Sequence, residues 1–329
     1  MTTDTEVAET ADAGVLGPAH DRRQDQLFRG LAIGASSIIV LIVVLVAVFL
    51  VTQAAPALRQ NTANFFTSRT FSIDTPPIMF GIADLLWATV VTSVIAILIA
   101  VPLGVSIALF LSHYAPARLA RPAAQLVALL AAVPSIIYGL WASQLVAPYY
   151  LPVQDFLEKI LGWIPLFAKT NTSGGATLMF AGIVLAVMIL PIITSLSREV
   201  FAQTPRFHEE AAIALGATRW EMIRMAVLPF GKPGVISAAM LGLGRALGET
   251  IAVTIIISSL SDANRQNFSL SLFNGGETFA SRIANNAAEF NTPTKAGAYL
   301  SAGLVLFVLT FVVNAVARVV IERRRAFSE

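Results

Sequence analysis

One polar segment decides the fold that this sequence predicts, and from residue 204 to residue 229 it reads TPRFHEEAAIALGATRWEMIRMAVLP. Thr204 followed by Pro205 predicts a helix start, because threonine caps helix N-termini and proline needs no amide partner in the first turn. Gly216 predicts the end of that helix. The segment therefore begins with one short helix that stops at a glycine.

A second short helix is expected directly after it. Thr218 and Glu221 have the spacing of a capping box, and Pro229, then Pro233, predict its end. The two helices would meet at a sharp Gly216–Ala217 corner. A rigid corner of this kind suits a mechanical contact with another protein, although two helices that only cap the fold would have the same pattern.

Apolar residues surround this segment on both sides. A membrane-spanning helix needs about 20 mostly apolar residues, and six stretches qualify: Leu31–Val51, Leu85–Leu111, Leu126–Val146, Thr177–Leu196, Val235–Leu260 and Ala298–Ala317. Ten-residue alternating strands of the barrel type are absent from the sequence, so helices are the structure that satisfies the backbone in lipid. We predict an all-α integral membrane protein with six transmembrane helices.

The composition agrees with a membrane bundle and excludes several classes. Of 329 residues, 56% are hydrophobic and 13% charged, against about 25% charged in soluble domains. The absence of cysteine excludes disulfide scaffolds, cysteine-ligated metals and thiol catalysis. With three scattered histidines, we expect no metal site and no cofactor in this chain. His113 and His208 are expected to be solvated near the inner surface.

Basic residues orient the bundle. If the N-terminus is inside, Lys and Arg favour the inner segments over the outer loops by about two to one, which predicts a plasma-membrane protein with both termini in the cytoplasm. Residues 1–30 read as a disordered N-terminal segment. Residues 31–84 hold the first span, an uncleaved anchor, and an outer loop. Residues 85–320 form the transmembrane domain, with the polar segment at about 204–230, and residues 321–329 form a cytoplasmic tail.

The fifth apolar stretch contains two charged residues, Arg245 and Glu249. Four residues apart on one helix, they would share a face and could form an ion pair. A charge at this depth costs about 2.5–3.5 kcal/mol, so it needs a reason. Either the pair neutralises itself and ties the bundle together, or Arg245 faces a transport path and binds an oxyanion through its planar fork. Physical chemistry alone leaves both readings open.

The polar segment resembles the coupling loop of ABC importer permeases, whose pattern is E-A-A, then G, then L-P at fixed spacing. The matching residues are Glu210, Ala211, Ala212, Gly216, Leu228 and Pro229. Ala226 departs from the usual isoleucine, which affects one packing contact. The resemblance implies a type I ABC importer bundle that docks onto a separate ATPase. The chain itself has no phosphate-binding G-x-x-x-x-G-K-[ST] loop.

The stretch GLGRALGETIAV, residues 242–253, is similar to the matching span of phosphate-specific ABC permeases of the PstC type. Residues 133–139, 198–200 and 216–221 agree, and the similarity covers roughly residues 80–320. It implies that Arg245 and Glu249 handle phosphate. Pro134 is a candidate kink that shapes a cavity.

The resemblance also implies partners. They are a second permease subunit of the PstA type, two copies of a cytoplasmic ATPase that uses ATP and Mg, and an extracytoplasmic phosphate-binding protein, with lipid around the spans and no nucleic acid. This chain would be a non-catalytic subunit. Rival functions are a proton-coupled anion transporter with Glu249 as relay, an intramembrane enzyme, and an ABC permease for another oxyanion.

Overall fold

The structure is a computed structural model that describes residues 19–74, 76–170, 175–257 and 269–325. The chain divides into two compact units, Met1–Phe49 and Leu50–Glu329, and helix α1 (Ala19–Gln60) contributes to both. The expected disorder of residues 1–30 is wrong for Ala19–Gly30, which are helical. No proline interrupts this segment, and it leads directly into an apolar run. Residues 1–18 lie outside the described residues.

Five helices in the described chain are long and apolar enough to cross a membrane, or six if one bent pair counts as a single span. Four of the expected stretches lie almost wholly in single helices. These are α1, α2 (Ala83–Leu109), which continues into the π-helix η1 (Phe110–Tyr114), α6 (Leu178–Ala202) and α13 (Pro293–Arg325). The two other stretches are helical but broken.

The third expected span, Leu126–Val146, is not one straight helix. Helix α3 (Ala117–Leu130) ends inside this stretch, and after a break α4 (Ser135–Trp141) leads through η2 (Ala142–Val146) into α5 (Ala147–Leu161). The two halves are bent by 90°. Pro134 stands directly before α4. Proline disfavours helical geometry in the residue before it, which accounts for a break at this position.

The fifth expected span, Val235–Leu260, is also interrupted. Helix α9 (Leu228–Leu247) ends first, and α10 (Ile251–Ile256) follows after a three-residue break. Leu260 lies outside the described residues. The same helix begins much earlier than expected, because α8 (Arg219–Met222) and the π-helix η4 (Ile223–Val227) run into α9 without interruption. We call this 29-residue run the 219–247 helix.

The sequence predicts that Pro229, then Pro233, end the second short helix. This prediction is wrong, because the helix continues through both prolines. The amide of Leu228 donates to the carbonyl of Ile223, five residues earlier, and forms the wide turn of a π-helix. A proline needs no amide partner of its own, and a wide turn just before it gives its ring room. This turn accommodates Pro229, and Pro233 lies further along the same continuous helix.

The shorter elements cover the ends of the bundle. Strands β1 (Phe71–Ser72) and β2 (Met79–Phe80) pair antiparallel, with Phe71 opposite Phe80. This hairpin packs with Ala57 of α1 and Tyr299 of α13 in a buried cluster. The remaining elements are η3 (Pro165–Phe167), α7 (Arg206–Ala214), α12 (Phe279–Asn285) and η5 (Ala287–Glu289).

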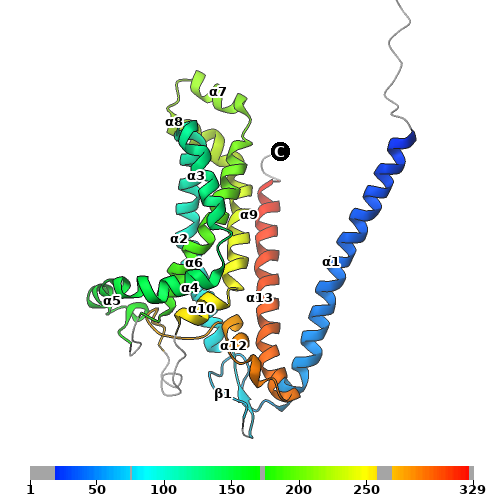
Figure 1. The fold of residues 1–329 in the computed structure, drawn as a ribbon, viewed down its shortest axis with the longest axis vertical. Helices are drawn as coiled ribbons and strands as arrows, with labels where there is room; N and C mark the ends of the chain where they lie inside the picture. The colour runs from blue at the N-terminus through cyan, green and yellow to red at the C-terminus, as the bar shows by residue number, and fades with distance from the viewer. Residues whose placement is uncertain (1–18, 75, 171–174, 258–268, 326–329) are drawn as a thin grey trace, which may run out of the picture. The chain divides into compact units, whose positions relative to one another are not determined.

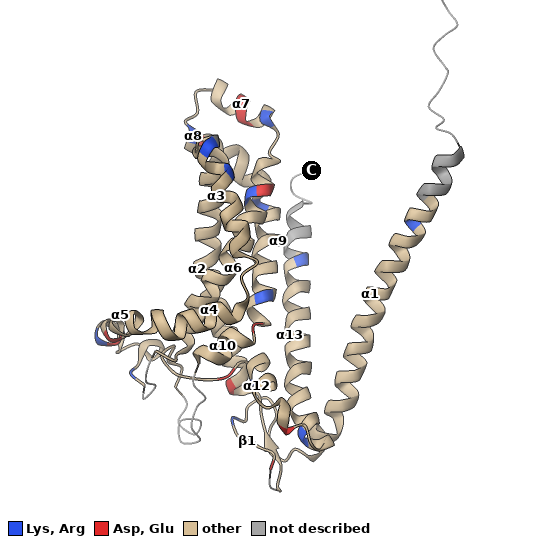
Figure 2. Cartoon of the chain, viewed as in Figure 1, with Lys and Arg blue, Asp and Glu red and all other residues tan. Residues whose placement is uncertain are grey.

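Helices α2, α6 and α9 form the centre of the Leu50–Glu329 unit (Figure 1). Two glycines let them approach closely: a Cβ on Gly182 would lie 2.7 Å from Ile95, and one on Gly242 would lie 3.0 Å from Ile193. Figure 2 shows charged residues gathered around α7 and α8, with few along the middle of the helices. Such a distribution is typical of a bundle embedded in lipid.

Candidate coupling surface and substrate path

Helix α7 starts one residue later than the sequence predicts. It begins at Arg206 with Pro205 as the N-cap residue. The Thr204 hydroxyl is buried and caps nothing: among the described residues it has no hydrogen-bond partner. The amide of His208 donates instead to the carbonyl of Pro205. The prediction of a threonine cap is therefore wrong, because Pro205 and not Thr204 occupies the N-cap position.

The end of α7 is a Schellman motif centred on Gly216. Gly216 has a φ of +86°, which favours glycine. Its amide donates to the carbonyl of Ile213 at 2.9 Å, and the amide of Ala217 donates to the carbonyl of Ala212 at 3.1 Å. The third residue of the E-A-A pattern and its glycine are therefore joined by the geometry of one helix end, which gives their four-residue spacing a physical reason.

The predicted capping box after this turn is present. The amide of Thr218 donates to Oε2 of Glu221 at 2.8 Å, and the amide of Glu221 donates to Oγ1 of Thr218 at 3.3 Å. The Schellman motif ends α7, and the capping box starts the 219–247 helix two residues later. We call α7, the turn at Gly216–Ala217 and α8 the coupling corner.

The coupling corner has one buried and one exposed side. Ala212 is buried in a cluster with Ala108 and Leu109 of α2, Phe201 of α6, and Ile223 and Val227 of η4. The other side of the coupling corner exposes large apolar side chains that our sequence analysis missed: Phe207, Ile213, Leu215 and Trp220. Leu215 is 89% exposed. Large apolar residues within a charged segment are a signal in the sequence, but only the fold shows that these side chains are exposed.

A polar contact also ties the coupling corner to α2. Nε2 of His113 lies 3.5 Å from Oε1 of Glu209, and the His113 side chain is only 9% exposed. Nδ1 of His113 lies 2.7 Å from the Ser112 hydroxyl, whose own proton is directed to the carbonyl of Ala108. The expectation that His113 is solvated is therefore wrong, because α7 covers it.

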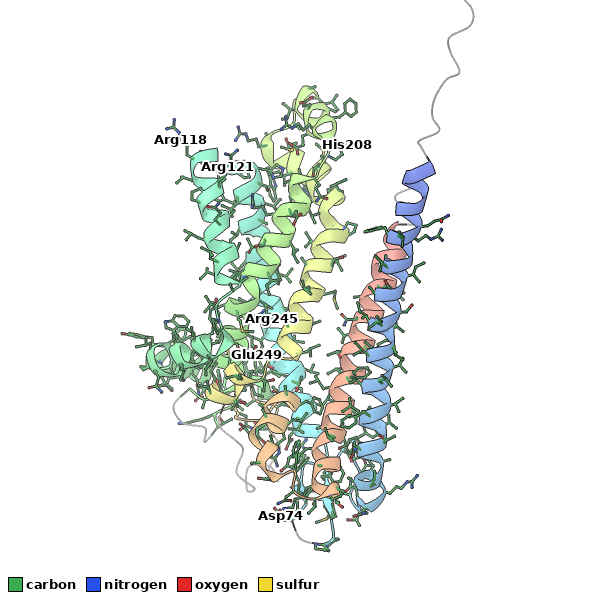
Figure 3. The ribbon with its side chains drawn as sticks, turned by 45° about the vertical axis from the view of Figure 1, so that its right-hand side comes forward. Asp74, Arg118, Arg121, His208, Arg245 and Glu249 are labelled. Atoms are coloured by element: carbon green, nitrogen blue, oxygen red, sulfur yellow. The ribbon has the colours of Figure 1, made fainter. Side chains whose placement is uncertain are left out.

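Arg245 and Glu249 lie on opposite sides of the break in the fifth span. Arg245 is in the last turn of α9, and its side chain is exposed. Glu249 follows the helix end and is 9% exposed, and its Oε1 accepts the amide of Ala252 at 3.1 Å. Glu249 thus serves the first turn of α10. Figure 3 shows both residues between the end that carries Arg118, Arg121 and His208 and the end that carries Asp74.

The expected Arg245–Glu249 ion pair is not formed. Within the described part of the chain, no salt bridge of 4.0 Å or less includes either residue. The shared helix face on which that prediction relied is interrupted at Gly248. This leaves the Arg245 guanidinium on the exposed face of α9 with its donors available to a ligand.

Helix α4 lies against the second half of this break. A Cβ on Gly139 would lie 3.0 Å from the Cα of Ala252. The Tyr138 hydroxyl donates to the carbonyl of Leu130 at 2.9 Å. Pro134 precedes α4 at the 90° bend. The structure therefore brings the two broken spans together, with α4 and α10 side by side.

Metal binding was the other site chemistry considered in the sequence analysis. Among the described residues, no group of three or more His, Cys, Asp or Glu side chains could hold a metal ion.

Gly244 has nothing within 4 Å of a Cβ position, so the surface beside Arg245 is open, whereas Gly242 packs on α6.

Comparisons with known proteins agree with this geometry. Residues 100–326 match the family described as "Binding-protein-dependent transport system inner membrane component". The "Phosphate transport system permease protein PstC 2" of Mycobacterium tuberculosis is 54% identical over 91% of this chain and 92% of its own length. The "Phosphate transport system permease protein PstC" of Mesorhizobium japonicum is 38% identical over 91% and 90%. A solved chain of the MetNI methionine ABC transporter in an inward-facing conformation has a TM-score of 0.50 and 19% identity, with 74% of this chain and 94% of that chain covered.

Proposed function

Since the chain belongs to the family of binding-protein-dependent transport system inner membrane components and is a permease subunit for phosphate import, we propose that its coupling corner and Arg245 are the two ends of one moving part. The observation that supports this proposal is the continuous 219–247 helix. It begins at the coupling corner and carries Arg245 in its last turn.

The coupling corner docks onto a separate cytoplasmic ATPase. Its exposed apolar side chains, with Leu215 foremost, are what a protein partner would bury, and Glu210 and Arg206 add exposed charges beside them. ATP and Mg bind in that partner, and this chain supplies no catalytic group. The Schellman motif and the capping box hold the corner in one shape, so force applied there moves it as a unit.

The 219–247 helix transmits the movement. At about 1.5 Å per residue, its 29 residues extend about 43 Å. Ala212 packs on Ile223 and Val227 at the start of this helix, and the His113–Glu209 contact adds a link to α2. A displacement of α7 therefore tilts the 219–247 helix relative to its neighbours and repositions Arg245 beside α4 and α10.

Arg245 binds the phosphate during its passage. Its guanidinium offers a planar fork of donors that matches two phosphate oxygens. The transport cycle requires that the site bind phosphate with different affinity in its two states, and the movement of the helix end provides that difference. Glu249 acts on this site by capping α10 and so holds the break in shape.

The assembly that we propose around this chain has two different permease subunits, two ATPases and an extracytoplasmic phosphate-binding protein. Both termini lie in the cytoplasm, on the same side as the coupling corner. A secondary transporter would need no ATPase, so phosphate uptake that persists in vesicles without the ATPase chain would contradict this assembly.

The test is phosphate uptake by the complete complex in proteoliposomes that contain Arg245→Gln. A charge-assisted hydrogen bond contributes about 1.5–3 kcal/mol, so we expect uptake to fall about 10- to 100-fold or more. Arg245→Lys keeps the charge and loses the fork, so it should recover part of the rate. Uptake by Arg245→Gln at the rate of the unmodified complex would show that Arg245 is not on the path.

A further inference from the structure

Helix α5 exposes an apolar stripe that serves no function described above. Its members are Tyr149, Val153, Phe156, Ile160 and, just beyond the helix end, Trp163, at alternating spacings of four and three residues. All five are exposed, Tyr149 to 80% and Trp163 to 81%. Spacings of three and four place them on one face of the helix.

The other faces of α5 have different surroundings. On the side packed against the bundle, the Tyr150 ring stacks on Phe180 with 4.6 Å between centroids, and Gln154 is buried and donates to Glu158 at 2.9 Å. Asp155 and Glu158 lie on the side away from the stripe, since each residue turns the helix by about 100°. The helix thus has a core-facing side, a polar side and an apolar side.

The contacts of Tyr150 fix the depth of α5. Phe180 is in the first turn of α6, which is 25 residues long and apolar enough to cross a membrane. At about 1.5 Å per residue, α6 extends about 38 Å, which exceeds the hydrocarbon thickness of about 30 Å. The first turn of α6 is therefore at the edge of the hydrocarbon region, and α5 is at the same level.

The direction of α5 agrees with this position. The helical run from Ser135 to Leu161 is bent by 90° from Arg118–Leu130, so it runs across the spans rather than along them. Figure 1 shows α5 extending outward from the bundle at this level. Tyrosine and tryptophan at the two ends of the stripe are the residues that membrane interfaces favour.

We propose that α5 is an interfacial helix whose apolar stripe contacts the lipid at the boundary between headgroups and acyl chains. Its stripe enters the membrane by about 5–10 Å, as in other amphipathic helices of this kind, and Asp155 and Glu158 stay toward water. Lipid is the occupant because the stripe combines aliphatic and aromatic side chains at the depth where the hydrocarbon region ends. The helix thereby holds the bend at Pro134, and with it α4, at a fixed height in the membrane.

Because this chain has no cysteine, one substitution gives it a single site for a spin label, and the partner subunits are used in cysteine-free form. Phe156→Cys and Ile160→Cys place labels on the stripe, and Asp155→Cys places a matched label on the polar side. Each variant is assembled into the complete transporter in phosphatidylcholine nanodiscs. Accessibility to dissolved oxygen, which enriches in lipid, and to a water-soluble nickel chelate is then measured by electron paramagnetic resonance.

We expect the two stripe labels to be accessible to oxygen and inaccessible to the nickel chelate. The label at Asp155→Cys should show the reverse preference. Stripe labels protected from both reagents would mean that a protein partner covers the stripe, and stripe labels open to the nickel chelate would place it in water. Either result overturns the proposal. Phosphate uptake by the same variants separates this outcome from a failure of the transport function.

Discussion

Replacing Gly216 by alanine tests whether the shape of the coupling corner matters for transport. Nothing lies within 4 Å of the position that a Cβ would take, so the substitution causes no steric clash with a neighbour. What changes is the backbone, because a φ of +86° disfavours any residue with a Cβ. Gly216→Ala therefore perturbs the corner without altering its exposed side chains.

The backbone cost of an L-residue in the left-handed region is about 1–2 kcal/mol. This cost lowers the population of the intact corner about 5- to 30-fold relative to relaxed alternatives. Relaxation would break the bonds from the Gly216 and Ala217 amides to the carbonyls of Ile213 and Ala212. Asparagine tolerates this region better than alanine, so Gly216→Asn is the matched control.

The assay measures the affinity of the ATPase for the permease complex in detergent and ATP-driven phosphate uptake after reconstitution. We expect Gly216→Ala to reduce both several-fold and Gly216→Asn to reduce them less. The reasoning is refuted if Gly216→Ala behaves like the unmodified protein, or if the asparagine variant is as impaired as the alanine variant.

Three further outcomes follow from individual contacts. Leu215→Asp should weaken ATPase binding by more than tenfold while the permease stays folded, measured by co-purification; undiminished binding would exclude Leu215 from the interface. His113→Gln and Glu209→Gln should each reduce coupled ATP hydrolysis, and a double-mutant cycle should give an interaction free energy of about 0.5–1 kcal/mol; strictly additive effects would argue against the contact. Gly182→Ala should lower the unfolding temperature because its methyl group would lie 2.7 Å from the Cβ of Ile95, whereas Gly244→Ala, which meets nothing, should not lower it.

The sequence is a good guide where local chemistry decides the structure. Gly216 ends α7 because its backbone conformation favours glycine, and the bonds of the Thr218–Glu221 capping box are formed between neighbouring residues. Long apolar stretches such as those in α2 and α6 are helical because lipid leaves the backbone no other partner. These features depend on few distant contacts, so residue patterns predict them.

The sequence misleads where packing or a neighbouring turn overrides local preference. Pro229 and Pro233 are helix breakers on their own, yet both lie inside a continuous helix, and the π-turn of η4 directly precedes Pro229. Arg245 and Glu249 have the spacing of a helical ion pair, but the chain breaks at Gly248 and the carboxylate caps α10. The burial of His113 depends on α7, which lies almost a hundred residues further along the chain.

The candidate functional residues also divide into those that local sequence patterns predict and those that depend on contacts between distant segments. The coupling residues of the E-A-A pattern could be located from their spacing, whereas the exposed surface formed by Phe207, Ile213, Leu215 and Trp220 required the fold. Pro134 and Arg245 lie in different apolar stretches, and only the approach of α4 to α10 brings their surroundings together. Contacts between distant segments of this kind leave no periodic signal in one sequence.

The central claim, that the 219–247 helix moves as one rigid element, can be measured directly. Spin labels at Met225→Cys and Leu241→Cys, both exposed positions, flank the two prolines and are separated by about 24 Å along the helix axis. The distance distribution is recorded by pulsed dipolar spectroscopy in a complex that imports phosphate, with ATP hydrolysis trapped and without nucleotide. We predict one unchanged distance in both states, and a distance that shifts on trapping would show that the helix bends and would contradict the account.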